Sequence, residues 1–123
     1  MNSKATLTSL IPDSISYYCS KVYEGIYNPY PLAQMNFNSL KKVYESVKDE
    51  LNIRYGISNL SGLADTVRRI DYILMRIETW LETNQLLSNS DAEVFMDAFS
   101  SHFDEFKTML KELDDEAREE NKD

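Results

Sequence analysis

Apolar residues recur at alternating steps of three and four between residues 60 and 81. They occupy positions 60, 63, 67, 70, 74, 77 and 81. Residues three and four apart share one face of an α-helix, so this spacing predicts an amphipathic helix over about 60–84. Ala64, Ile73 and Trp80 widen the stripe beyond what a two-stranded coiled coil needs. We therefore expect this helix to lie at the centre of the chain's own core, with Trp80 at the end of the core or in a homodimer contact.

Three further segments show the same helical period. The predicted helices run over about 12–27, 37–55 and 90–118, with 119–123 frayed. Pro12 is expected to open the first of them, because proline is tolerated where the first amide groups of a helix have no partner. Together with the helix over 60–84, these segments account for most of the chain.

Turn-forming and capping residues set the limits of the predicted helices. Residues 28–31, Asn-Pro-Tyr-Pro, form the clearest break, because each proline lacks an amide hydrogen and favours extended conformations in the residue before it. Asn36 or Asn38 is expected to cap the second helix, and Gly56 is expected to end it.

The fourth helix is expected to begin at a cap formed by Asn89 or Ser90. Four amphipathic helices joined by short connections are typical of an antiparallel bundle, in which each apolar stripe meets its neighbours at a shallow angle. The predicted fold is therefore all-α, an antiparallel four-helix bundle-like single domain of residues 1–123 with an acidic C-terminal helix end.

The net charge of −8 is concentrated near the C-terminus. Residues 1–88 hold 9 basic and 9 acidic side chains, whereas residues 89–123 hold 4 basic and 12 acidic ones. A surface of this sign repels phosphate backbones, so direct nucleic-acid binding is disfavoured. The expected partner is a protein with a basic or mixed surface.

Two features favour a cytoplasmic location. The chain has one cysteine, Cys19, which excludes an internal disulfide and a thiolate zinc cluster. No apolar run approaches the roughly 18 residues that a membrane span needs. We expect a soluble protein that neither crosses nor enters a membrane.

Candidate chemistry is sparse. His102 is the single histidine, and Glu105 is the polar residue one turn away that could orient it as a base. A carboxylate-bridged metal site in a bundle needs two Glu-x-x-His pairs, and residue 99 is Phe. Cys19 falls within an apolar stripe, where thiols are inert. We expect no catalytic residue, no metal and no cofactor, and therefore no enzymatic activity.

Arg68, Arg69 and Arg76 form the densest basic cluster. Asp65 lies three residues from Arg68 and four from Arg69, and Asp71 lies three residues from Arg68. This spacing favours ordinary ion pairs on a solvated helix face. The alternative is a DNA-reading helix, which the long core-facing stripe of the same segment disfavours.

Two sets of residues are candidate partner-binding surfaces. Tyrosine supplies apolar area with a polar tip, which suits an interface with a dry centre and a wet rim, and carboxylates attract a basic partner. The tyrosines crowd the first helix and the loop after it, and the carboxylates lie on the fourth helix. The candidate residues are Tyr17, Tyr23, Tyr27, Tyr30, Asp104, Glu105, Glu112, Asp115 and Glu116.

These observations favour a small, acidic, non-enzymatic protein-binding module of the inhibitor, antitoxin or immunity type. It would act by occupying the surface of a partner protein. Two alternatives stay open. One is a structural or assembly subunit that acts as a homo-oligomer, and the other is a nucleic-acid-associated regulator or an inhibitor that presents its acidic face to a nucleic-acid-handling enzyme.

Overall fold

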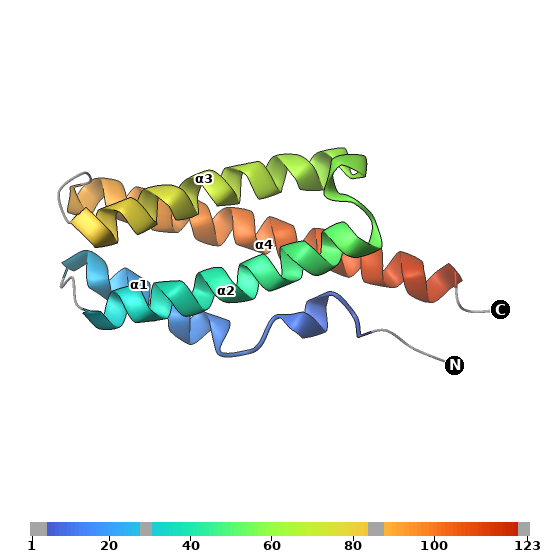
Figure 1. Cartoon of the computed structure of the whole chain (residues 1–123), viewed down its shortest axis with the longest axis horizontal. Coiled ribbons are helices and arrows are strands. Elements are labelled where there is room, and N and C mark those ends of the chain that lie inside the picture. The colour runs from blue at the N-terminus through green and yellow to red at the C-terminus, as the bar shows by residue number, and fades with distance from the viewer. Residues whose placement is uncertain (1–4, 28–30, 84–87, 121–123) are drawn as a thin grey trace.

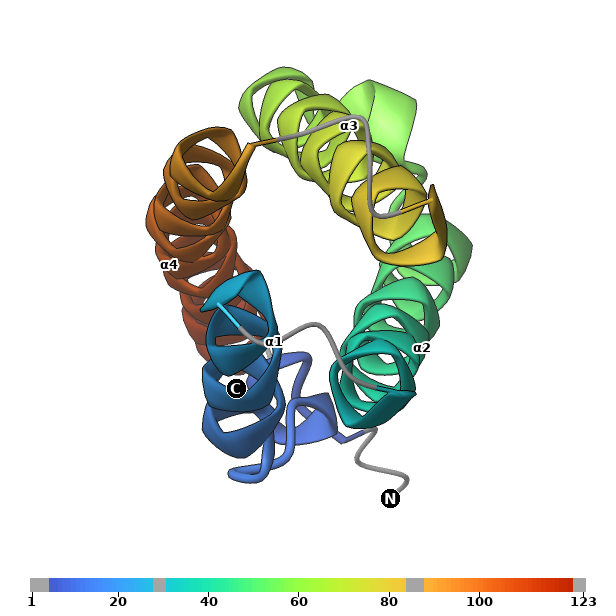
Figure 2. The same ribbon diagram turned by 90° about the vertical axis from the view of Figure 1, so that its left-hand side faces the viewer.

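The computed structural model describes residues 5–27, 31–83 and 88–120. Over these residues the chain is an all-helical single domain of four antiparallel helices, which confirms the predicted fold (Figure 1). The helices are α1 (Ile15–Tyr27), α2 (Pro31–Arg54), α3 (Ser61–Thr83) and α4 (Asn89–Glu120). Seen end-on, they follow one another around a common centre in chain order (Figure 2). α1 packs mainly on α2, and α3 mainly on α4.

α1 begins later than predicted. Its start at residue 12 was wrong, because the Ile15 N–H donates to the Pro12 carbonyl at 3.1 Å and the first full-turn bond runs from the Tyr18 N–H to the Ser14 carbonyl, also at 3.1 Å. Pro12 therefore belongs to the turn before the helix. A short 3-10 helix, η1 (Thr8–Leu10), precedes that turn.

α2 begins earlier than predicted, at Pro31 instead of residue 37. Asn36 and Asn38 lie inside the helix, so neither of them is its cap. Proline is favoured at a first helical position because its missing N–H would have no partner there. The extra turn also carries Ala33, which packs so closely on α1 that a Cβ added to Gly25 would lie 2.4 Å from the Ala33 Cβ. Residues 28–30 of the predicted break lie outside the described residues.

Gly56 ends the second helix as predicted. Its φ of 78° lies in the left-handed region that glycine adopts without strain, and its N–H donates to the Asn52 carbonyl at 2.9 Å. A second 3-10 helix, η2 (Ile57–Asn59), leads into α3.

α3 and α4 match their predicted spans to within two residues. The predicted cap of α4 was wrong, because the Ser88 side chain accepts the Asp91 N–H at 3.1 Å and Asn89 is the first helical residue. Residues 119 and 120, predicted to fray, are helical, and 121–123 lie outside the described residues.

The apolar stripe of α3 lies inside the core of its own chain. Its buried residues are Leu63, Val67, Ile70, Ile73, Leu74, Ile77 and Trp80. Trp80 is only 2% exposed, so the suggestion of a homodimer contact at this residue was wrong. One phenylalanine of α4 crosses the core to meet α2, where the Phe106 ring lies 5.5 Å from the Tyr44 ring.

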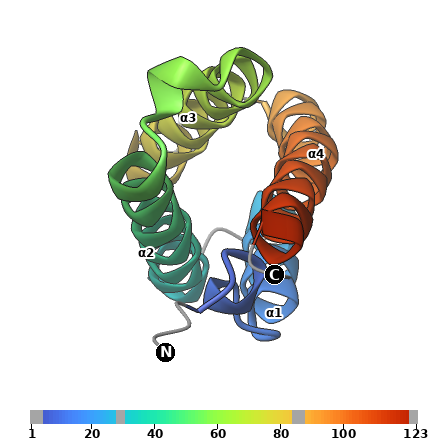
Figure 3. The same ribbon diagram turned by 90° about the vertical axis from the view of Figure 1, so that its right-hand side faces the viewer.

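One carboxylate ties the start of the described chain to α4. Asp114 accepts the Leu7 N–H at 2.8 Å with Oδ1, and the Thr8 N–H at 3.1 Å and the Thr8 hydroxyl at 2.9 Å with Oδ2. Leu7 is fully buried in the same place. The segment before α1, which we call the N-terminal strap (residues 5–11), therefore lies against the C-terminal half of α4 (Figure 3).

Candidate functional site

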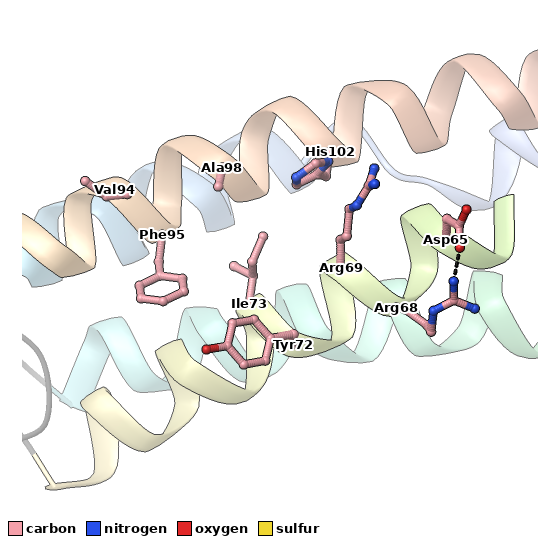
Figure 4. Close-up of a pocket in the computed structure, with 9 residues that line it drawn as sticks. All are labelled: Asp65, Arg68, Arg69, Tyr72, Ile73, Val94, Phe95, Ala98 and His102. Carbon is pink, nitrogen blue, oxygen red and sulfur yellow. Dashed lines mark hydrogen bonds and ion pairs between the residues drawn. The ribbon is translucent and has the colours of Figure 1, made fainter. Parts of the chain in front are cut away.

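A groove of about 490 Å³ lies between α3 and α4. We call it the α3–α4 groove, and Figure 4 shows its lining. Residues of α3 and α4 face each other across it because the two helices are antiparallel neighbours. The lining residues are Asp65, Arg68, Arg69, Tyr72, Ile73, Val94, Phe95, Ala98 and His102.

Aromatic rings from both helices meet in the groove. The Tyr72 ring lies 6.1 Å from the Phe95 ring, and the Arg76 guanidinium lies over the Phe95 ring at 5.6 Å from its centroid. An arginine above an aromatic ring is attracted by the electrons of the ring face, and the pair is stronger when water is excluded. Buried Ile73 lies beside them. The middle of the groove is therefore apolar, with a cation at its side.

Exposed apolar side chains gather around this groove. Tyr72 is 52% exposed and Val94 is 65% exposed, and Phe95 is half-buried. Single exposed apolar residues are ordinary, but a group of them around a hollow marks an interaction surface. Sequence analysis did not predict this site, although Tyr72 and Val94 fall outside the apolar stripes of their helices.

The arginines differ in their partners. Arg68 pairs with Asp65 on the same helix, as predicted. Asp71 was predicted to pair with these arginines as well, but it binds Lys48 of α2 at 3.2 Å instead. Burial lowers the pKa of Lys48, but bonds from Asp71 and Glu45 outweigh burial and raise it.

Arg69 consequently keeps no carboxylate partner among the described residues, and the same holds for Arg76. Arg69 extends from α3 toward α4 and the His102 ring, whereas Arg68 points along α3 to Asp65 (Figure 4). The groove thus carries a cationic group that this part of the chain leaves uncompensated.

His102 lines the groove from α4, opposite Arg69 (Figure 4). Its side chain is 24% exposed, and its Nδ1 lies 3.7 Å from Glu105 Oε2, beyond hydrogen-bond distance. That Nδ1 atom is buried and has no hydrogen-bond partner among the described residues. A histidine that acts as a general base is normally held by a hydrogen bond on its second nitrogen. The geometry here lacks that bond.

Two tyrosines of the predicted surface, Tyr17 and Tyr23, have described side chains, and their surroundings differ. Tyr17 is 53% exposed and contacts its neighbours on α1, Tyr18 at 6.2 Å between ring centroids and Lys21 at 5.5 Å. Tyr23 is half-buried, and its hydroxyl donates to Asp97 of α4. The side chain of Tyr27 and the whole of Tyr30 lie outside the described residues.

The predicted acidic surface is partly neutralised by neighbouring bases. Asp104 pairs with Lys107 at 3.4 Å, and Asp115 pairs with Arg118 and with Lys111, the latter at 3.4 Å. Bonds from Arg118 and Lys111 lower the pKa of Asp115 below its usual value. Glu112 and Glu116 are exposed and have no ion pair with any described residue. They are the part of the predicted acidic surface that stays open, together with Glu105 near His102.

Cys19 packs against the core from α1. Burial raises the pKa of its thiol to about 11, opposed by nearby Lys107 and reinforced by Asp104. It is therefore a neutral thiol near pH 7. Within residues 5–27, 31–83 and 88–120, no group of three or more His, Cys, Asp or Glu side chains is placed to hold a metal ion. None of the helices described is long and apolar enough to cross a membrane.

Comparisons of the chain with models of known protein families, with curated protein sequences and with solved structures find no match.

Proposed function

We propose that the protein is a non-enzymatic binding module that occupies the surface of a partner protein through the α3–α4 groove. The observation that carries the proposal is the position of Tyr72 and Val94, two exposed apolar residues that line a groove of about 490 Å³. Aromatic residues and arginine are among the residue types enriched in protein interfaces. The α3–α4 groove has both in its lining, with Tyr72 and Phe95 beside Arg69.

The rigidity of the platform supports a role that works by occupation. The groove walls are two long helices whose inner faces are fixed in the core by Ile70, Ile77 and Phe99. A preformed surface binds without first ordering itself, which lowers the entropic cost of association. In this proposal the protein acts in the cytoplasm as an inhibitor, antitoxin or immunity-type protein, whose effect comes from covering its partner.

Two exposed tyrosines provide a matched test. Tyr72 lies in the groove and is 52% exposed, and Tyr17 lies on α1 and is 53% exposed. Tagged wild-type protein, Tyr72→Ala and Tyr17→Ala are each used to capture proteins from the lysate of the native host, and captured proteins are quantified by mass spectrometry. We expect a partner that is retained by wild type and by Tyr17→Ala and reduced at least about tenfold with Tyr72→Ala.

The opposite pattern assigns binding elsewhere. Loss with Tyr17→Ala and retention with Tyr72→Ala would contradict the groove and favour the tyrosine surface of α1. If both tyrosine variants retain the partner and the double variant Glu112→Lys, Glu116→Lys loses it, the result would favour the acidic end of α4. Recovery of nothing but the protein itself would contradict the proposal and favour a homo-oligomeric assembly subunit, which light scattering over a range of concentrations would then detect.

A further inference from the structure

We infer that the α3–α4 groove receives an acidic amphipathic helix of the partner protein, with carboxylates that pair with Arg69 and Arg76 and apolar side chains that contact Tyr72 and Phe95. The inference rests on the proposed function, and it names the chemistry of the bound segment. It differs from the sequence-based expectation of a basic or mixed partner, which followed from the acidic excess near the C-terminus.

The first argument is the distribution of uncompensated bases. Almost every basic side chain in residues 5–27, 31–83 and 88–120 has a carboxylate within ion-pair distance. The exceptions in these ranges are Lys42, Arg69 and Arg76. In a chain with net charge −8, carboxylates are plentiful, so two unpaired arginines on one short stretch of α3 are notable. A carboxylate from outside the chain fits there by charge complementarity.

The second argument is the spacing of those arginines. Arg69 and Arg76 are seven residues apart, which is two helical turns or about 10 Å along α3. A partner helix that lies along α3 presents its own residues seven apart at the same spacing and on one face. Two carboxylates in that relation meet both arginines together, whereas an isolated small anion meets one.

The third argument is the apolar floor between the charges. Ile73 lies between the two arginines in sequence and is buried, and Phe95 and Ala98 approach from α4. Two antiparallel helices leave a channel between their outer ridges into which a third helix packs with its apolar stripe. One amphipathic helix can therefore contact the apolar residues of the α3–α4 groove and pair with its arginines.

A nucleic acid fits the same surface poorly. Asp65 lies in the groove wall and already neutralises Arg68, which leaves Arg69 and neighbouring Arg76 as the uncompensated charges. Binding to a phosphate backbone gains its strength from many phosphate contacts and needs a continuous basic track. The groove supplies apolar contact instead.

The test uses a phage-displayed library of helical 18-residue peptides. The positions on the face that contacts the protein are randomised among acidic, basic, polar and apolar residues. Selection is carried out on the wild-type protein, and enriched peptides are measured by fluorescence anisotropy against wild type, Arg69→Glu and Tyr72→Ala. The matched controls are Lys42→Glu, an exposed and unpaired base on α2, and Tyr17→Ala. All of these substitutions are at surface positions, and circular dichroism verifies that each variant folds.

We expect enriched peptides that carry Asp or Glu seven residues apart beside an apolar stripe. Their affinity should fall about thirtyfold with Tyr72→Ala and at least about tenfold with Arg69→Glu, and stay within about twofold with both controls. Peptides with Lys in place of the acidic residues should bind at least about tenfold more weakly to wild type and recover with Arg69→Glu.

Several results would overturn the inference. These are enrichment of basic or neutral peptides, affinity unaffected by Arg69→Glu, or equal enrichment in a parallel selection carried out on Tyr72→Ala. Self-association that Tyr72→Ala abolishes would assign the groove to a second copy of the chain. In each case the capture experiment with Tyr17→Ala and Tyr72→Ala still decides the proposed function independently, because it uses the native partner and not a peptide.

Discussion

Tyr17 on α1 and Tyr72 on α3 are almost equally exposed, at 53% and 52%, and yet they lie in different surroundings. Tyr17 contacts Tyr18 and Lys21, both on its own helix. Tyr72 faces Phe95 on another helix and borders a groove with an unpaired arginine. The comparison shows that exposure by itself does not make a binding site. Tyr72 differs from Tyr17 because side chains of two helices, α3 and α4, meet beside it in the α3–α4 groove.

The largest expected effect comes from truncating one buried aromatic side chain of the core. Phe106 is fully buried, and its ring packs on Tyr44 and Phe103. Phe106→Ala should lower the free energy of unfolding by about 4 kcal/mol, since the lost contacts and the cavity both count. Urea denaturation followed by circular dichroism measures this change. Glu112→Ala, at an exposed position of the same helix, is the control and should leave the unfolding free energy within about 0.5 kcal/mol.

A second prediction compares the reactivity of a thiol on α1 with that of a thiol introduced in the α3–α4 groove. Because burial raises the pKa of Cys19 to about 11 from an ordinary 9.0, the thiolate is scarce at neutral pH. At about pH 8 iodoacetamide should modify Cys19 about a hundredfold more slowly in the folded protein than in urea. The rate should rise about tenfold for each pH unit until the pH reaches the pKa.

The matched variant is Val94→Cys in a Cys19→Ser background, because Val94 is 65% exposed at the groove. This introduced thiol should react at nearly the same rate in folded and unfolded protein. Equal rates for the two positions in the folded state would show that the α1 side is as open as the groove.

A third prediction separates the α1 side from the groove through the N-terminal strap. Asp114→Ala removes the acceptor of the Leu7 and Thr8 amides and should lower the unfolding free energy by about 2 kcal/mol, because hydrogen bonds to a charged, half-buried group are stronger than neutral ones. Hydrogen exchange should accelerate at Leu7 and Thr8 and stay unchanged at Tyr72. Asp104→Ala, an exposed carboxylate of α4, is the control. Faster exchange throughout α3 in Asp114→Ala would mean that the strap supports the groove as well.

The smallest expected effect sharpens the opening comparison. Tyr17→Ala and Tyr72→Ala should each change the unfolding free energy by no more than about 0.5 kcal/mol, because half-exposed residues contribute little to folding. Thermal denaturation of the two variants side by side measures this difference. A much larger loss for Tyr72→Ala would show that its ring serves the packing of α3 on α4 and would weaken its role in binding.

The helical period was enough to predict the bundle, because burial depends on the repeat of apolar positions. In α3 the residues that set the stripe, such as Val67, Ile70 and Ile77, are the buried ones. The starts of α1 and α2 were missed for another reason. α1 starts only after the turn at Pro12, and the first turn of α2 carries Ala33, whose close contact with Gly25 of α1 is one that no local pattern contains.

The groove could not be predicted for a related reason. Local spacing placed Asp71 within reach of the arginines, whereas its actual partner, Lys48, comes from α2. The meeting of Tyr72 with Phe95 depends on the register between α3 and α4. The sequence does contain a weak signal, since Tyr72 and Val94 are apolar residues outside the stripes of their helices. Apolar residues outside the stripes indicate a binding surface more directly than the composition of a helix does.

The bond between the N-terminal strap and Asp114 also sets an order for events during synthesis. Leu7 and Asp114 are 107 residues apart, so Leu7 leaves the ribosome long before its anchor exists. At about 5 to 20 residues per second, the strap waits roughly 5 to 20 s without its partner. During that interval an apolar leucine and two unpaired amides are open to chaperones and proteases, so the strap can be docked only when translation of α4 is nearly finished.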